Sequence, residues 1–307
     1  MALTPIVAHK KQLAAKIESV PGTAEVLANT DATDRVINPV FEDITEKVRE
    51  RRNLTGWHPG VLGVKFGRIT FEVEAYAGSA TPRLGATYLA ACGLGNTTSV
   101  YRRDSRHILI SASTVKTLTM GFYQDGTFNQ IHGAMGNCVI SGEAGKVGRL
   151  KFTFSGVYTP MTDVALLSVT YATPALLRLQ EAAFSIGALS PKISKFELDL
   201  GNEVEPFLDA NAVGGCAYWM ISDHQAKLTV DPIMGLVAEE DIYSLFEDGT
   251  ESAINIALKN GSDSMTIAFT KGEVISLSRQ ERSKLAAWNL VLGDNAADLN
   301  ITFATGT

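Results

Sequence analysis

The sequence predicts an all-β protein with minor α content, built as two tandem β-sandwich or barrel modules with one short flanking helix each. Most of the chain alternates apolar and polar residues at period two, with turn residues between the runs. Helical patterns are few and short, and segments of the first half reappear in the same order in the second. Since the chain has 307 residues, two domains are the default expectation.

The strand predictions depend on alternation and on one turn. Residues 69–76 and 150–154 carry apolar side chains at every second position, which is typical of half-buried antiparallel strands. Residues 117–131 predict a hairpin whose turn is Asp125-Gly126, because the glycine supplies the positive φ that a tight turn needs.

Two short helices are expected, one in each half. Thr81 and Pro82 suit the N-cap and first position of a helix that Gly93 ends. The second begins with the acidic residues 239–241, which favour the positive end of a helix dipole, and Gly249 ends it. Its apolar stripe is Ile242, Leu245 and Phe246.

The two halves match in an ordered series, which favours a duplication over chance similarity of strands. The matching segments are 41–44 with 196–199, 69–73 with 226–230, 88–89 with 245–246, 117–122 with 264–269, and 150–154 with 299–303. We therefore expect an N-terminal arm at residues 1–34, a first module at 35–170, a connector at 171–190 and a second module at 191–307.

Composition excludes some classes of protein. The net charge of -6 argues against a high-affinity DNA binder, which needs a basic face to displace counterions. The cysteines at 92, 138 and 216 form no disulfide framework and suit a reducing cytosol. We find no signal peptide and no apolar run long enough to span a bilayer, so we expect a soluble protein without a membrane partner.

No catalytic or metal-binding pattern is recognisable. Gly145-Lys146 lacks the leading glycine and the Ser/Thr of a phosphate-binding loop, so a polar turn is the simpler interpretation. His132 and Cys138 could be imagined as base and nucleophile, but no orienting carboxylate accompanies them. The histidines show no metal-ligand spacing. We predict a protein that is not an enzyme and takes no cofactor or metal.

Two long segments differ in charge. The basic arm, residues 46–63, carries Lys47, Arg49, Arg51 and Arg52 near its start, whereas the acidic arm, residues 201–209, carries Glu203, Glu205 and Asp209. Long loops in compact domains are usually functional. The arms are either two unrelated solvated loops or equivalent elements of opposite sign that attract one another across a contact between subunits.

Five stretches together resemble siphophage tail tube (major tail) proteins, and the resemblance spans nearly the whole chain. They are residues 16–24 (Lys-Ile-Glu-Ser-Val-Pro-Gly-Thr-Ala), 119–126, 133–146, 150–156 and 196–204. The resemblance implies the tail-tube fold, a β-sandwich with a flanking helix and a long loop that contacts the adjacent ring.

The resemblance also implies a function and partners. Such proteins stack as rings into a hollow tube that delivers the genome, so we expect a virion tail protein assembled in the host cytoplasm. A chain with two modules predicts three copies per pseudo-hexameric ring. The implied partners are further copies of the chain, a tape measure protein and phage DNA in the lumen, and tail terminator and distal tail proteins at the ends. The arm residues named above are the expected inter-ring contact.

An alternative function is a two-module carbohydrate- or receptor-binding protein, which would expect exposed aromatic platforms. Trp57, Trp219 and Trp288 lie in separate segments, and apolar residues flank the last two. Core packing is the simpler account of these two side chains.

Overall fold

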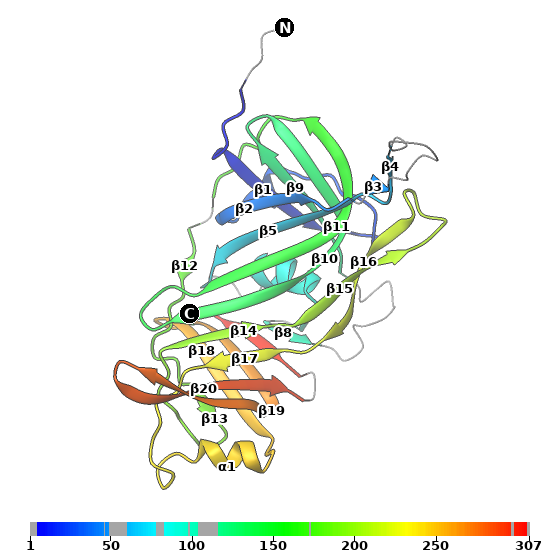
Figure 1. Cartoon of the computed structure of the whole chain (residues 1–307). Coiled ribbons are helices and arrows are strands. Elements are labelled where there is room, and N and C mark those ends of the chain that lie inside the picture. The colour runs from blue at the N-terminus through cyan, green and yellow to red at the C-terminus, as the bar shows by residue number, and fades with distance from the viewer. Residues whose placement is uncertain are drawn as a thin grey trace.

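The computed structural model describes residues 5–45, 47–48, 60–77, 83–97, 99–103, 116–171, 173–295 and 298–305. Within these residues, fifteen strands join into one sheet, and three pairs of short strands lie outside it (Figure 1). The helical elements are short: η1 (Asn29–Ala32), η2 (Leu84–Leu89) and α1 (Ile242–Glu247). The predicted class, all-β with minor α content, is confirmed.

The first half of the chain forms one stretch of this sheet. Its strands pair antiparallel in the order β2-β5-β11-β10-β9-β1. Their bounds are β1 (Lys11–Ile17), β2 (Val36–Asp43), β5 (Phe66–Glu74), β9 (Leu118–Gln124), β10 (Thr127–Glu143) and β11 (Arg149–Asp163).

The second half forms another stretch with a similar order, β14-β17-β20-β19-β18-β13. The bounds are β13 (Ser185–Ile186), β14 (Lys195–Asp199), β17 (Lys227–Val230), β18 (Ser252–Asn260), β19 (Asp263–Arg282) and β20 (Leu285–Asp294).

The remaining strands are hairpins and connections. Two hairpins project from the sheet: β3 (Lys47–Val48) with β4 (Val61–Leu62), and β15 (Asn202–Leu208) with β16 (Cys216–His224). β6 (Tyr76–Ala77) pairs with β12 (Ala175–Leu176). β7 (Leu94–Thr97) pairs with β8 (Val100–Arg103), and β8 also pairs with β21 (Asn300–Ala304).

The strand patterns fold as predicted. The buried side chains of β5, Ile69, Phe71 and Val73, lie opposite Phe154, Phe152 and Leu150 of β11. The predicted hairpin joins β9 to β10, and φ is +39° at Asp125 and +103° at Gly126. The sequence places apolar residues on one face because one face packs into the core.

The first predicted helix covers this core. In η2, the ring of Tyr88 lies 5.2 Å from Phe71 and 5.3 Å from Phe152. Gly93, with φ at +81°, follows the helical turns as expected. The predicted cap, Thr81 and Pro82, lies outside the described residues.

The second predicted helix is present, with two corrections: α1 begins at Ile242, after the acidic residues expected to open it, and its apolar stripe is narrower. Only Asp241 caps α1, and its Oδ1 accepts a hydrogen bond from the Ser244 amide at 3.0 Å. Ile242 is buried, but Phe246 is 39% exposed and does not belong to the apolar stripe. A helix of six residues has room for only a narrow buried face.

Strand pairing changes two of the sequence correspondences. β9 and β18 occupy the same place in the two stretches, as do β11 and β20. The comparison of the two sequences gave different pairs. It aligned residues 117–122 with 264–269, which matches β9 to β19, and residues 150–154 with 299–303, which matches β11 to β21. Short strands with the same alternation of apolar and polar residues cannot be distinguished by sequence. Their position in a sheet depends on pairing with strands that are distant in the sequence.

The two halves are interlocked. β10 pairs with β14, and β8 of the first half pairs with β21 near the C-terminus. The predicted connector is itself packed, since Leu177 and Leu179 are buried and the Arg178 amide donates to the Lys259 carbonyl at 3.0 Å. If the halves were separated, the backbone groups that pair β10 with β14 and β8 with β21 would lose their hydrogen-bonding partners.

We accordingly expect residues 191–307, expressed alone, to show no cooperative thermal transition by circular dichroism. The fragment loses β8 and β10, so it exposes the edges of β21 and β14 and half of a shared core. The full chain, measured in parallel, should unfold cooperatively. A sharp transition from the fragment would contradict this prediction.

Candidate assembly surfaces

The halves meet edge to edge at an internal seam, in which residues 139–143 of β10 pair with residues 195–199 of β14. Ile140 lies opposite Leu198, and neither side chain is exposed. Both strands also pair on their other sides, β10 with β11 and β14 with β17. The seam thus turns two similar stretches into one continuous sheet.

Corresponding rows of core side chains cross the two stretches. In the first, Val36 lies opposite Val73, Val73 opposite Leu150, and Leu150 opposite Ile140. In the second, Phe196 lies opposite Val230, Val230 opposite Leu290, and Leu290 opposite Leu277. The rows relate β2 to β14 and β10 to β19 residue by residue.

Several strands of the continuous sheet, β1 and β7 among them, pair on one side only within the described residues. Two more are the counterparts of the seam strands: β2 and the second half of β19. β2 pairs only with β5, although the Lys11 ammonium donates to the Pro39 carbonyl at 3.2 Å. β19 pairs with β18 only as far as Gly272, so residues 273–282 pair with β20 alone. An unpaired edge presents free N–H and C=O groups to another strand.

The predicted contact residues lie on the two projecting hairpins, as far as they are described. Lys47 is exposed in β3, whereas Arg49, Arg51 and Arg52 lie outside the described residues. Glu203 and Glu205 are exposed on β15. Asp209 has a local role, because its Oδ1 accepts hydrogen bonds from the Asn211 amide at 2.8 Å and Nδ2 at 3.0 Å.

The acidic arm belongs to a larger acidic hairpin. Residues 202–224 also contain Asp223, and they contain neither lysine nor arginine. Glu203 lies directly opposite Asp223, and like charges in that position destabilise a strand pair. A cationic partner would relieve this repulsion.

The roots of the two arms lie side by side in one chain. The rings of Phe66 and Trp219 make an edge contact at 5.1 Å, and Gly215 adjoins Val64. Both hairpins project from the same side of the molecule (Figure 1). Pairing of the arms across rings stays a prediction, and attraction within one chain has to be distinguished from it.

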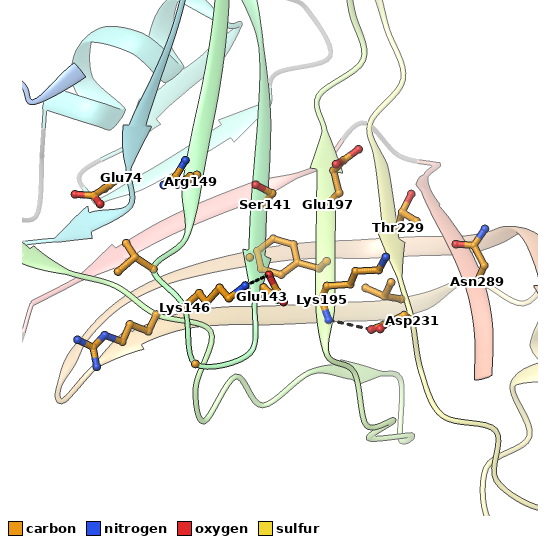
Figure 2. A pocket seen from close by; sticks show the side chains of 16 residues that line it. Glu74, Ser141, Glu143, Lys146, Arg149, Lys195, Glu197, Thr229, Asp231 and Asn289 are labelled. Atoms are coloured by element: carbon orange, nitrogen blue, oxygen red, sulfur yellow. Dashed lines mark hydrogen bonds and ion pairs between the residues drawn. The ribbon is translucent and has the colours of Figure 1, made fainter. Parts of the chain in front are cut away.

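A polar basin of about 960 Å³ lies over the internal seam (Figure 2). Its charged lining is balanced: Glu74, Glu143, Glu197 and Asp231 against Lys146, Arg149, Arg178 and Lys195. Glu143 lies opposite Lys195 in the seam and forms an ion pair with Lys146 at 2.7 Å. Because the charges are mutually compensated, the basin offers no concentrated field to hold a polyanion.

Asp231 at the rim of the basin ties the second half together. Its carboxylate accepts from the amides of Ser194 and Lys195 at 2.8 and 2.9 Å and forms an ion pair with Arg282 at 3.2 Å. Burial raises the pKa of Asp231, but the hydrogen bonds from Ser194 and Lys195 outweigh it, so the pKa lies below its ordinary value. This carboxylate is structural.

The imagined base and nucleophile do not meet. His132 and Cys138 lie six residues apart on β10, about 20 Å along the strand. Cys138 is fully buried, and burial raises the pKa of its thiol well above the usual range. Burial also lowers the pKa of His132. The thiol is therefore neither accessible nor activated.

Other predicted features fall where expected. Gly145-Lys146 forms the turn between β10 and β11, with φ at +78° for Gly145. Trp219 is 7% exposed, and Trp288 is half-buried with the Arg279 guanidinium 5.8 Å from its ring. Trp57 lies outside the described residues. Trp219 and Trp288 therefore provide no exposed aromatic platform.

Sequence reasoning missed a buried carboxylate in the N-terminal segment. Glu18 is 5% exposed and accepts hydrogen bonds from the hydroxyls of Thr117, just before β9, at 2.5 Å and Thr119, within β9, at 2.9 Å. The amides of Gly22 and Gly133 also donate to it, each at 2.7 Å. The only signal in the sequence is a glutamate that follows the apolar strand β1 and precedes a Pro-Gly turn.

A second missed carboxylate, Asp34, joins this segment to η2. It accepts from the hydroxyls of Tyr76 and Tyr88 at 2.9 and 3.0 Å and from Arg83 Nε at 2.9 Å. Arg83 also donates to the Ala15 carbonyl at 2.9 Å. Contacts of Glu18 and Asp34 therefore fasten this segment to the first half.

In the described part of the chain, no three His, Cys, Asp or Glu side chains are placed to hold a metal ion. None of the described helices is long and apolar enough to cross a membrane. No protein-family model matches the chain, and no curated protein is similar to it in sequence.

Proposed function

We propose that this chain is a virion structural protein that polymerises as stacked rings into a phage tail tube, the conduit for genome delivery. The resemblance of its motifs to siphophage tail tube proteins suggests the role. The observation that supports it best is the internal seam, at which two stretches of similar strand order are joined edge to edge. A sheet that extends by this joint inside one chain, and has an unpaired edge on β2 and on β19, is suited to extend between chains.

The seam also bears on the number of chains in a ring. If each stretch corresponds to one module, three chains supply six modules and close a pseudo-hexameric ring. Closure would remove the unpaired edges, which otherwise invite aggregation. A compensated polar face such as the basin would let DNA and a tape measure protein pass without being held.

We expect native mass spectrometry of isolated rings to give a complex of three 32.9 kDa chains. Cryo-electron microscopy of tubes should show a three-fold ring with six similar units. Six full-length chains per ring would contradict the trimer, because it would leave half of the modules without a place in a six-unit wall.

Negative-stain microscopy of the concentrated protein tests the function itself. Rings or tubes support the proposal. Monodisperse monomers that bind immobilised glycans would overturn it in favour of the carbohydrate- or receptor-binding alternative.

A further inference from the structure

We propose that the free edge of β19 pairs antiparallel with β2 of a second copy, with Val36 opposite Arg279 and Ile37 opposite Ser278. This inference rests on the proposed ring assembly and names the interface and its register. The pairings within one chain supply the register.

The internal seam provides the template for the register. There, Gly142 of β10 lies opposite Phe196 of β14, and Ser141 lies opposite Glu197. The next pair is Ile140 with Leu198. If the joint between chains copies this one, the equivalents of these residues define it.

The rows of core side chains supply the equivalents. Val36 and Phe196 both begin a row, so β2 takes the place of β14. Ile140 and Leu277 both end a row, so β19 takes the place of β10. Two residues beyond Leu277, Arg279 therefore takes the place of Gly142.

The side chains at the internal seam are more deeply buried than their equivalents at the free edges, as expected if a second copy covers those edges. At the internal seam, Ile140 is 0% and Phe196 2% exposed. Their equivalents Leu277 and Val36 pack against the core but are only partly buried. A second copy seated on the edge would cover both side chains, and removing this apolar surface from water favours the pairing.

The edge of β2 also limits what can pair with it. Asn38 has φ at +48°, the register against β5 shifts between Ile37 and Val40, and Pro39 has no N–H to donate. A long strand of arbitrary sequence therefore cannot pair along the whole of β2. A joint at Val36 and Ile37 is therefore short, which favours specific pairing over indiscriminate aggregation.

Oxidative cross-linking tests the register. In the double variant Ile37→Cys with Ser278→Cys, opposed Cα atoms of an antiparallel pair would lie about 4.5–5.5 Å apart, within the range of a disulfide. We expect assembled rings to give covalent dimers and trimers on a non-reducing gel, with the linked peptide identified by mass spectrometry. The native cysteines are buried and should not contribute.

The matched control is Ile37→Cys with Gln280→Cys, which moves one cysteine two residues along the same face of β19. It should cross-link at least ten-fold less. Both single-cysteine chains should keep the wild-type thermal transition, which separates a misfolded variant from a wrong register.

Rings of the Ile37/Ser278 variant without cross-links, or stronger cross-linking in the Gln280 control, would overturn the register while leaving the tube function standing. If neither the wild type nor the variants form rings, the proposed function fails instead.

Discussion

Replacing Glu18 with alanine should lower the free energy of unfolding by about 3–5 kcal/mol, a large part of the total for a typical protein. The carboxylate is 5% exposed, and its oxygens accept four hydrogen bonds. Alanine would leave the part-buried amide of Gly22 and the buried amide of Gly133 without this acceptor. Chemical denaturation of the variant and the wild type measures the difference.

The effect should extend beyond the N-terminal segment. A Cβ on Gly22 would lie 2.2 Å from the Ala217 carbonyl oxygen, and one on Gly133 would lie 2.9 Å from the Tyr218 Cα. The turn after β1, the irregular part of β10 and the root of the acidic hairpin thus meet around Glu18. Hydrogen exchange should accelerate in all three segments.

Two further substitutions separate the causes. Glu18→Gln keeps the shape and one acceptor oxygen, so it should cost less than alanine. Glu25→Ala removes a carboxylate of the same turn that is more exposed than Glu18, at 20% of its side chain, and that contacts Ser19 and Lys16, so the effect should be smaller. Equal losses for Glu18→Ala and Glu25→Ala would show that burial of Glu18 is not the reason for its contribution.

Local patterns predicted the local structure. The alternation in residues 69–76 and the turn at Asp125-Gly126 led to strands and a hairpin that the structure contains. These features depend on neighbours in sequence, because burial of one face and a positive φ are properties of a few consecutive residues. The ends of both short helices followed from Gly93 and Gly249 for the same reason, whereas the cap predicted at Thr81 and Pro82 lies outside the described residues.

The arrangement of strands could not be predicted in this way. β8 pairs with β21, so Tyr101 lies opposite Ile301, and nothing near either residue in the sequence indicates the other. The same limit explains the two mismatched correspondences. Met120 of β9 lies opposite Ile131, and Ile256 of β18 lies opposite Ile267, so the pairing relates β9 to β18. The alternation of apolar and polar residues in β9 is no more similar to that in β18 than to that in β19, so the sequence alone does not reveal this relation.

The candidate site also has features that the sequence predicts and features that only strand pairing reveals. The opposite charges of the two arms are visible in the sequence, because composition needs no partner. The free edges of β2 and β19 are not, since an edge exists only once every other pairing is known. Glu18 was missed because three of its four donors, Thr117, Thr119 and Gly133, are more than ninety residues away in the sequence.

Reversing two charges in the basic arm, Arg51→Glu with Arg52→Glu, should slow tube elongation about ten-fold at low salt and less at high salt. In the acidic hairpin, Glu203 already faces Asp223, and no lysine or arginine is present to offset them. Acidic residues in place of the arginines would add repulsion. Adding Glu203→Lys and Glu205→Lys should partly restore growth, which light scattering and electron microscopy can follow.

The matched control reverses two exposed lysines away from the arms, Lys192→Glu with Lys271→Glu, and so changes the net charge equally. Elongation should then remain close to that of the wild type. If the Arg51/Arg52 variant also polymerises unchanged, the arms do not pair.

Because the roots of the arms adjoin within one chain, a mixing experiment is needed to locate the attraction. The Arg51→Glu/Arg52→Glu chain has two acidic arms, and the Glu203→Lys/Glu205→Lys chain has lost the acidic charge of its hairpin while keeping a basic arm. If the arms pair between chains, each variant supplies what the other lacks, and the mixture should polymerise faster than either variant alone. If they pair within a chain, each molecule keeps its own mismatch, and mixing should restore nothing.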